Sequence, residues 1–241
     1  MTDKLDKPKV TVPTVGTVHK IKLSGLHSRL FKAQQNITNN PPESMPNRIC
    51  ILPDCSGSMS GEVSGLTNGP RKTKMDYLKE AVESFGENCK WSETSVAVMS
   101  FPYDVTELPL TNQQGMFVAG ITTLKVSGDT PMGHSMARAI ESIPMTRAII
   151  ISDGEATDNP KPEETARQYA EAKIPIDCVH IGYDQRGEEL LQEIAKITEG
   201  KYIKFDNVAN FAKALKYLTP AYRALLNAPS AAAILGAKEV K

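Results

Sequence analysis

Two aspartates stand one residue after short apolar segments, where side chains in a folded protein can meet a ligand. Asp54 follows residues 49–52, and Asp153 follows residues 148–151. Because the carboxyl ends of neighbouring parallel strands share one edge of a sheet, we expect the two carboxylates to lie together there. Hydroxyl groups accompany them, two in an Asp-x-Ser-x-Ser pattern and one in the later turn Ser-Gly-Asp-Thr-Pro. These hydroxyl-bearing candidates are Ser56, Ser58 and Thr130.

Carboxylates and hydroxyls are hard oxygen ligands of the kind that Mg²⁺ prefers. We expect Ser56, Ser58 and Thr130 to bind Mg²⁺ or Mn²⁺ directly, and Asp54 and Asp153 to bind the ion or hold its waters. So few protein ligands leave one coordination position open, which a carboxylate from outside the chain could fill. The sequence therefore predicts a divalent-cation site that recognises an acidic group.

Other interpretations of the same residues compete with this one. An Asp-x-Ser-x-Ser segment can be a polar turn that satisfies its own backbone amides. A two-aspartate Mg²⁺ phosphatase needs a carboxylate where this chain has Ser56, so a hydrolase is disfavoured. The glycines that precede Lys72 suggest a phosphate-binding loop, but Arg71 stands where that motif requires glycine.

The elements that must position the site alternate between apolar runs and amphipathic segments. Runs that are apolar at successive positions predict buried strands at 49–52, 95–101, 148–151, 176–181 and 202–205. The more polar run 105–110 predicts an antiparallel edge strand. Helices are predicted at 75–85, 132–143, 163–173, 188–198 and 208–218, the first with a capping box formed by Thr73 and Asp76. This order indicates an α/β fold with a doubly wound, Rossmann-like sheet and helices on both faces.

The two ends of the chain differ from this regular middle. We divide the sequence into an N-terminal extension (1–46), a domain (47–218) and a C-terminal tail (219–241). The alternation also predicts six core residues, Ile49, Ile51, Val96, Val98, Ile149 and Ile151.

Composition excludes several functional classes. The 28 basic and 28 acidic residues among 241 cancel, so no net positive field favours nucleic acid or an anionic membrane. No apolar stretch approaches the roughly 20 residues that a membrane-spanning helix needs. The first residues lack the apolar core of a secretion signal, and the four cysteines form no C-x-x-C pair. We therefore expect a cytoplasmic protein with free thiols.

The three-part pattern Asp54-x-Ser56-x-Ser58, Thr130 and Asp153 resembles a von Willebrand factor A (VWA) domain with a complete metal-ion-dependent adhesion site (MIDAS). The resemblance covers about residues 47–218. It implies the strand order 3-2-1-4-5-6 with strand 3 antiparallel, which gives five parallel strands and one antiparallel edge strand.

The resemblance also implies a function. VWA proteins bind partners reversibly through Mg²⁺, often by an Asp or Glu of the partner, and some act with AAA+ ATPases or in stress responses. It implies an adaptor or scaffold without catalysis, whose last helix, here 208–218, shifts when a partner binds. The loop 61–73 is longer than in many members of the family. The alternatives are a structural component of a self-assembling particle and a metal-dependent hydrolase.

Overall fold

A single sheet forms the centre of the computed structural model, which describes residues 41–62, 72–102, 106–154, 156, 160–205 and 238–239. Its strands lie in the order β3-β2-β1-β4-β5-β6-β7. Their bounds are β1 (Asn47–Pro53), β2 (Thr94–Met99), β3 (Thr106–Thr111), β4 (Arg147–Ser152), β5 (Ile176–Ile181), β6 (Tyr202–Phe205) and β7 (Lys238–Glu239).

The predicted strand pattern is confirmed. Strands β2, β1, β4, β5 and β6 run parallel to their neighbours in this series, and β3 pairs antiparallel with β2. The seventh strand, β7, pairs antiparallel with β6 and was not predicted. It is only two residues long, too short to leave a periodic pattern in the sequence.

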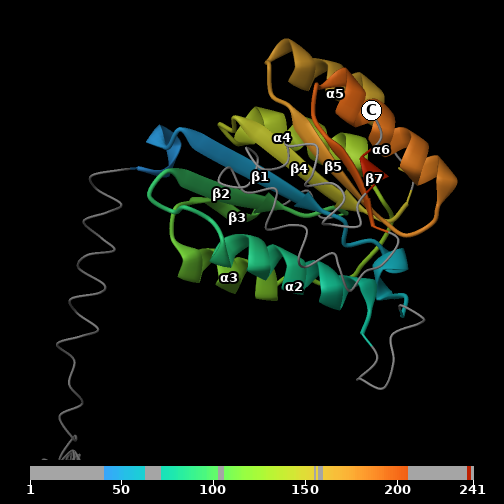
Figure 1. Cartoon of the computed structure of the whole chain (residues 1–241), viewed down its shortest axis with the longest axis horizontal. Helices are drawn as coiled ribbons and strands as arrows, with labels where there is room; N and C mark the ends of the chain where they lie inside the picture. Colours follow the sequence, from blue (N-terminus) through green and yellow to red (C-terminus); the bar gives the residue numbers. More distant parts are fainter. Residues whose placement is uncertain are drawn as a thin grey trace, which may run out of the picture.

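Helices cover both faces of the sheet (Figure 1). Helices α2 (Lys74–Glu87) and α3 (Gln114–Thr122) lie on one face, and α4 (Met132–Ser142), α5 (Pro162–Glu171) and α6 (Gln185–Ile197) lie on the other. Two short 3₁₀ helices, η1 (Pro42–Ser44) and η2 (Gly57–Ser60), flank β1. One apolar core fills each side of the sheet. The predicted core residues all pack in the core on the α2 and α3 side: Ile49, Ile51, Val96, Val98, Ile149 and Ile151.

The helix boundaries follow local chemistry. Thr73 and Asp76 form the predicted capping box at the start of α2, with the Thr73 side chain accepting from the Asp76 N–H. Helix α3 was not predicted from the sequence. It has only nine residues, includes two glycines, and buries just Phe117, Gly120 and Ile121, so its amphipathic pattern is weak.

Several sequence predictions lie outside the described residues. These are the helix 208–218, most of the N-terminal extension, most of the loop 61–73, and the C-terminal tail apart from β7. Within the part of the chain that the structure describes, no helix is both long enough and apolar enough to cross a membrane.

Candidate metal centre

The two predicted aspartates lie where the strand order reverses. Strands β1 and β4 are parallel neighbours, and Pro53 is in register with Ile151, so Asp54 and Asp153 leave the sheet side by side. The Asp54 N–H donates to the Ile151 carbonyl at 2.8 Å. From β1 the chain continues to α2 on one face, whereas from β4 it continues to α5 on the other. This divergence opens the crevice in which doubly wound folds bind ligands.

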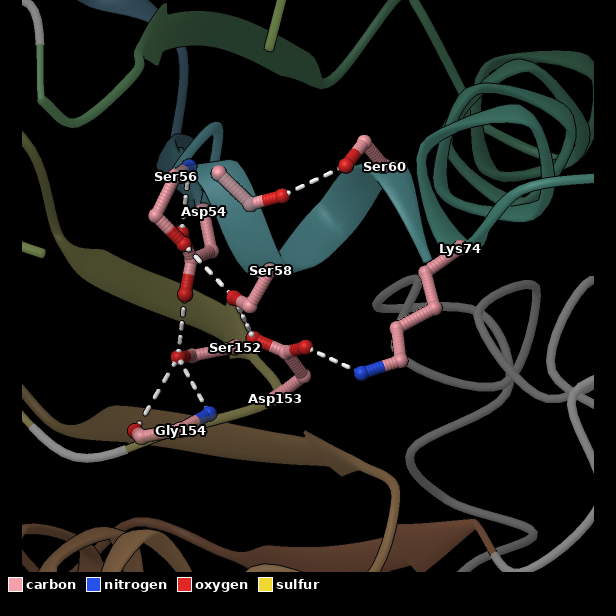
Figure 2. Close-up of polar contacts among 9 residues, drawn as sticks. Asp54, Ser56, Ser58, Ser60, Lys74, Ser152, Asp153 and Gly154 are labelled. Carbon is pink, nitrogen blue, oxygen red and sulfur yellow. Dashed lines mark hydrogen bonds and ion pairs between the residues drawn. The ribbon is translucent and has the colours of Figure 1, made fainter. Parts of the chain in front are cut away.

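A chain of hydrogen bonds joins the polar side chains at this edge (Figure 2). Ser56 Oγ and Ser58 Oγ lie 2.9 Å apart, and Ser58 Oγ donates to Asp153 Oδ1 at 2.8 Å. The Ser56 N–H donates to Asp54 Oδ1 at 2.8 Å. The structure therefore links four of the five predicted ligands in one chain of hydrogen bonds, and Ser58 in this chain is exposed at the protein surface.

The Asp54 carboxylate is completely buried. Its second oxygen, Oδ2, accepts a 2.6 Å hydrogen bond from Ser152 Oγ. Burial raises the pKa of Asp54, while the hydrogen bonds from Ser152 and Ser56 lower it and the nearby charge of Asp153 raises it again. The charge of Asp153 is the smallest of these effects, and a cation bound beside the two carboxylates would offset it.

Thr130, the fifth predicted ligand, is buried in a loop that packs against the Asp-x-Ser-x-Ser segment. The Gly57 N–H donates to the Gly128 carbonyl at 3.0 Å, and the Ser127 N–H donates to the Cys55 carbonyl at 2.7 Å. Gly128 has φ +65°, a left-handed conformation that glycine adopts without strain. These backbone bonds hold the Thr130 loop beside the serines.

The structure adds two residues that the sequence analysis missed. Ser152 fixes Asp54 from the neighbouring strand, and Lys74 Nζ pairs with Asp153 Oδ2. Ser152 precedes Asp153 directly, so its position at the strand end was a usable signal. Lys74 is separated from Ser58 by the long loop, but it immediately follows the helix cap Thr73, which places it in the first turn of α2.

The donor set fits a hard divalent cation. Within the described ranges, no three His, Cys, Asp or Glu side chains gather in a metal-binding arrangement. A cation here would therefore depend on the serine and threonine hydroxyls and on water in addition to Asp54 and Asp153. Such an all-oxygen set suits Mg²⁺ or Mn²⁺. Cys55 does not compete as a ligand, because it packs in the core on the α2 side and burial raises the pKa of its thiol to about 12.

His180 on β5 has a described hydrogen-bond partner at only one of its two ring nitrogens. Its Nδ1 lies 3.3 Å from the hydroxyl of Tyr202, but its Nε2 has no hydrogen-bond partner among the described residues. The side chain is fully buried, and burial lowers its pKa. In register, His180 is the neighbour of Ser152 on β4.

Comparison with known proteins shows which family model and which relatives this chain resembles. The family model of the von Willebrand factor type A domain matches residues 49–155. An uncharacterized protein of Bacillus subtilis strain 168, YwmC, is 24% identical over 196 residues, which are 75% of this chain and 85% of that protein.

Two solved structures resemble this one. The VWA domain of SpRpn10 is 17% identical with a TM-score of 0.55, covering 72% of this chain and 95% of that one. Proximal thread matrix protein 1 from the mussel byssus, solved with zinc in its MIDAS motif, is 18% identical with a TM-score of 0.54 over 72% of this chain. Our chain spans 47% of the length of that structure. The chain therefore has the VWA fold, which is used by a family of protein-interaction modules.

Proposed function

We propose that this chain is a non-catalytic protein-interaction module that binds its partner through Mg²⁺ or Mn²⁺ at a MIDAS. The observation that carries the proposal is the hydrogen-bonded group of Asp54, Ser56, Ser58 and Asp153 at the reversal of the strand order. The match to the VWA family model and the similarity to a VWA structure with zinc in its MIDAS support it.

Each residue has a separate part in this function. The hydroxyls of Ser56, Ser58 and Thr130 would hold the cation, and Asp153 would bind it or one of its waters. Both oxygens of Asp54 already accept hydrogen bonds, which hold this carboxylate in place. Asp54 would therefore orient a water molecule bound to the cation. When bound, the cation supplies an open coordination position for a carboxylate of the partner.

The partner chemistry follows from this arrangement. An Asp or Glu at an exposed tip of the partner would complete the coordination, so the partner presents an acidic segment rather than a basic one. The VWA resemblance makes an AAA+ ATPase one candidate. The described cysteines are all buried and unpaired, which fits a reducing compartment and supports action in the cytoplasm.

A capture experiment tests the proposal. The full chain is immobilised and exposed to a lysate of its source in Mg²⁺ or in EDTA, using the wild type and the Thr130→Ala and Asp153→Ala variants. We expect retained proteins only with the wild type in Mg²⁺. Thr122→Ala, which alters an exposed threonine at the end of α3, serves as the matched control and should retain the same proteins as the wild type.

One result contradicts the proposal. If the same proteins remain bound in EDTA and with Thr130→Ala, the contact does not involve a cation at this site. The binding surface would then lie elsewhere, with the loop 61–73 and the two ends of the chain as the regions to examine next.

A further inference from the structure

A lysine lies against the carboxylate that is proposed to bind the cation. Lys74 Nζ forms an ion pair with Asp153 Oδ2, while the other oxygen of Asp153 accepts from Ser58 (Figure 2). The Asp153 side chain is 2% exposed and that of Lys74 is 27% exposed. This pair is therefore more buried than an ordinary surface ion pair, which contributes little to stability because solvent screens it.

The backbone holds this lysine in place. The Lys74 N–H donates to the Gly61 carbonyl at 3.0 Å, directly after η2. An isolated bridge pairs Glu62 with Thr73, and the capping box fixes Thr73 as the residue before the helix. The start of α2 is therefore tied to the end of the segment that carries Ser56 and Ser58, and the lysine side chain reaches Asp153 from an anchored position.

We propose that Lys74 is an internal competitor for the cation, lowering the affinity of the site for Mg²⁺ or Mn²⁺. This inference rests on the proposed function. A divalent cation and an ammonium group repel each other, and both need the charge of the same buried carboxylate. Metal binding at Asp153 therefore weakens its ion pair with Lys74, and the free energy lost from that pair is subtracted from the free energy of metal binding.

The competition has a consequence for the chain without metal. Because Asp153 is almost fully buried beside Asp54, its charge needs compensation, and Lys74 supplies it. Lys74 therefore stabilises the fold when no cation is bound and opposes the cation when one is present. A variant without the ammonium should change both quantities, in opposite directions.

Calorimetric titration with Mn²⁺ tests the inference on the full chain. We expect Lys74→Met to bind Mn²⁺ about tenfold more tightly than the wild type, which corresponds to about 1.4 kcal/mol. Its melting temperature in EDTA should be lower than that of the wild type. Lys79→Met, on the same helix but in contact with the Thr122 carbonyl, is the matched control and should bind Mn²⁺ within twofold of the wild type.

The charge itself is tested by two further variants. Lys74→Gln replaces the ammonium group with a neutral polar side chain and should also bind Mn²⁺ more tightly than the wild type. Lys74→Arg keeps the positive charge, so its affinity for Mn²⁺ should stay near that of the wild type. If the wild type binds Mn²⁺ and neither Lys74→Met nor Lys74→Gln binds it more tightly, the competition is refuted while the metal site stands. If neither the wild type nor these variants bind Mn²⁺, the proposed function fails and the inference fails with it.

Discussion

His180 lies at the carboxyl end of β5, beside the strand that leads to Asp153, and its ring is fully buried. Burial lowers the pKa of His180 below its usual 6.5. The negative charge of Glu188 raises this pKa and the positive charge of Lys204 lowers it, but both effects are smaller than that of burial. The negative charges of Asp184 and Asp153 also favour the charged form of the ring and so raise its pKa. The imidazole is therefore held neutral in the folded chain, close to the proposed site but without a part in it.

This lowered pKa predicts acid sensitivity. Between about pH 6.5 and the lower folded pKa, the unfolded chain binds more protons at His180 than the folded chain, so the free energy of unfolding falls as the pH falls. Urea unfolding in EDTA at pH 7.5, 6.5 and 5.5 should show this loss in the wild type. His180→Phe should lose less stability over the same interval. An identical slope in both proteins would show that His180 does not titrate in the way that its burial predicts.

Single residues of the site were predictable where their spacing is local. Asp54, Ser56 and Ser58 lie within one short segment, and Asp153 directly follows β4, so the ends of the two strands were enough to predict that they meet. Lys74 was not predictable in the same way, because the ion pair with Asp153 spans 79 residues of sequence and depends on how α2 begins. Nothing in the sequence spacing indicates that Lys74, rather than Lys79 on the same helix, pairs with Asp153.

At the scale of elements, close backbone contacts set how the helices rest on the sheet. The clearest is at Gly200, where the chain passes from α6 to β6. A Cβ placed there would lie 1.8 Å from the Ile176 carbonyl oxygen, far inside van der Waals contact. Only glycine lets this connection approach the start of β5 so closely.

We therefore predict that Gly200→Ala lowers the free energy of unfolding by about 2 kcal/mol or more, since backbone must move to admit the methyl group. Gly115→Ala is the matched control, because a Cβ at Gly115, in the first turn of α3, meets nothing within 4 Å. It should leave stability unchanged or raise it by up to about 1 kcal/mol. Equal stability losses in the two variants, measured by urea unfolding, would contradict this account of the connection.

The elements that the sequence predicted are those with strong periodicity. The central parallel strands are almost completely buried and carry runs of apolar residues. Helices α2, α4, α5 and α6 each bury one apolar stripe. Helix α3 was not predicted because it is short, contains glycine and is only weakly amphipathic. Strand β7 was not predicted because it has only two residues and depends on pairing with another part of the chain. Neither element carries a proposed ligand, so the site was predictable although the fold was not complete.

In the molecule as a whole, the strand order brings residues that are distant in sequence together at one site. Three parts of the site are far apart in sequence: the Asp-x-Ser-x-Ser segment, the Thr130 loop and Asp153. They meet because β1 and β4 are neighbouring strands, and because the chain leaves these two strands toward opposite faces of the sheet. We propose that this edge of the sheet binds a divalent cation through Asp54 and Asp153 together with the three hydroxyls.

The most direct test counts bound Mn²⁺ by the loss of its free electron paramagnetic resonance signal during titration. We compare the wild type with Asp54→Asn and Asp153→Asn, and circular dichroism checks that each variant is folded. We expect about one bound Mn²⁺ per chain in the wild type, displaced by Mg²⁺ and less readily by Ca²⁺, which needs more ligands. Both variants should bind none in the same concentration range. A folded Asp54→Asn or Asp153→Asn chain that binds Mn²⁺ as the wild type does, or a wild type that binds none, would show that these residues do not form a site for a divalent cation.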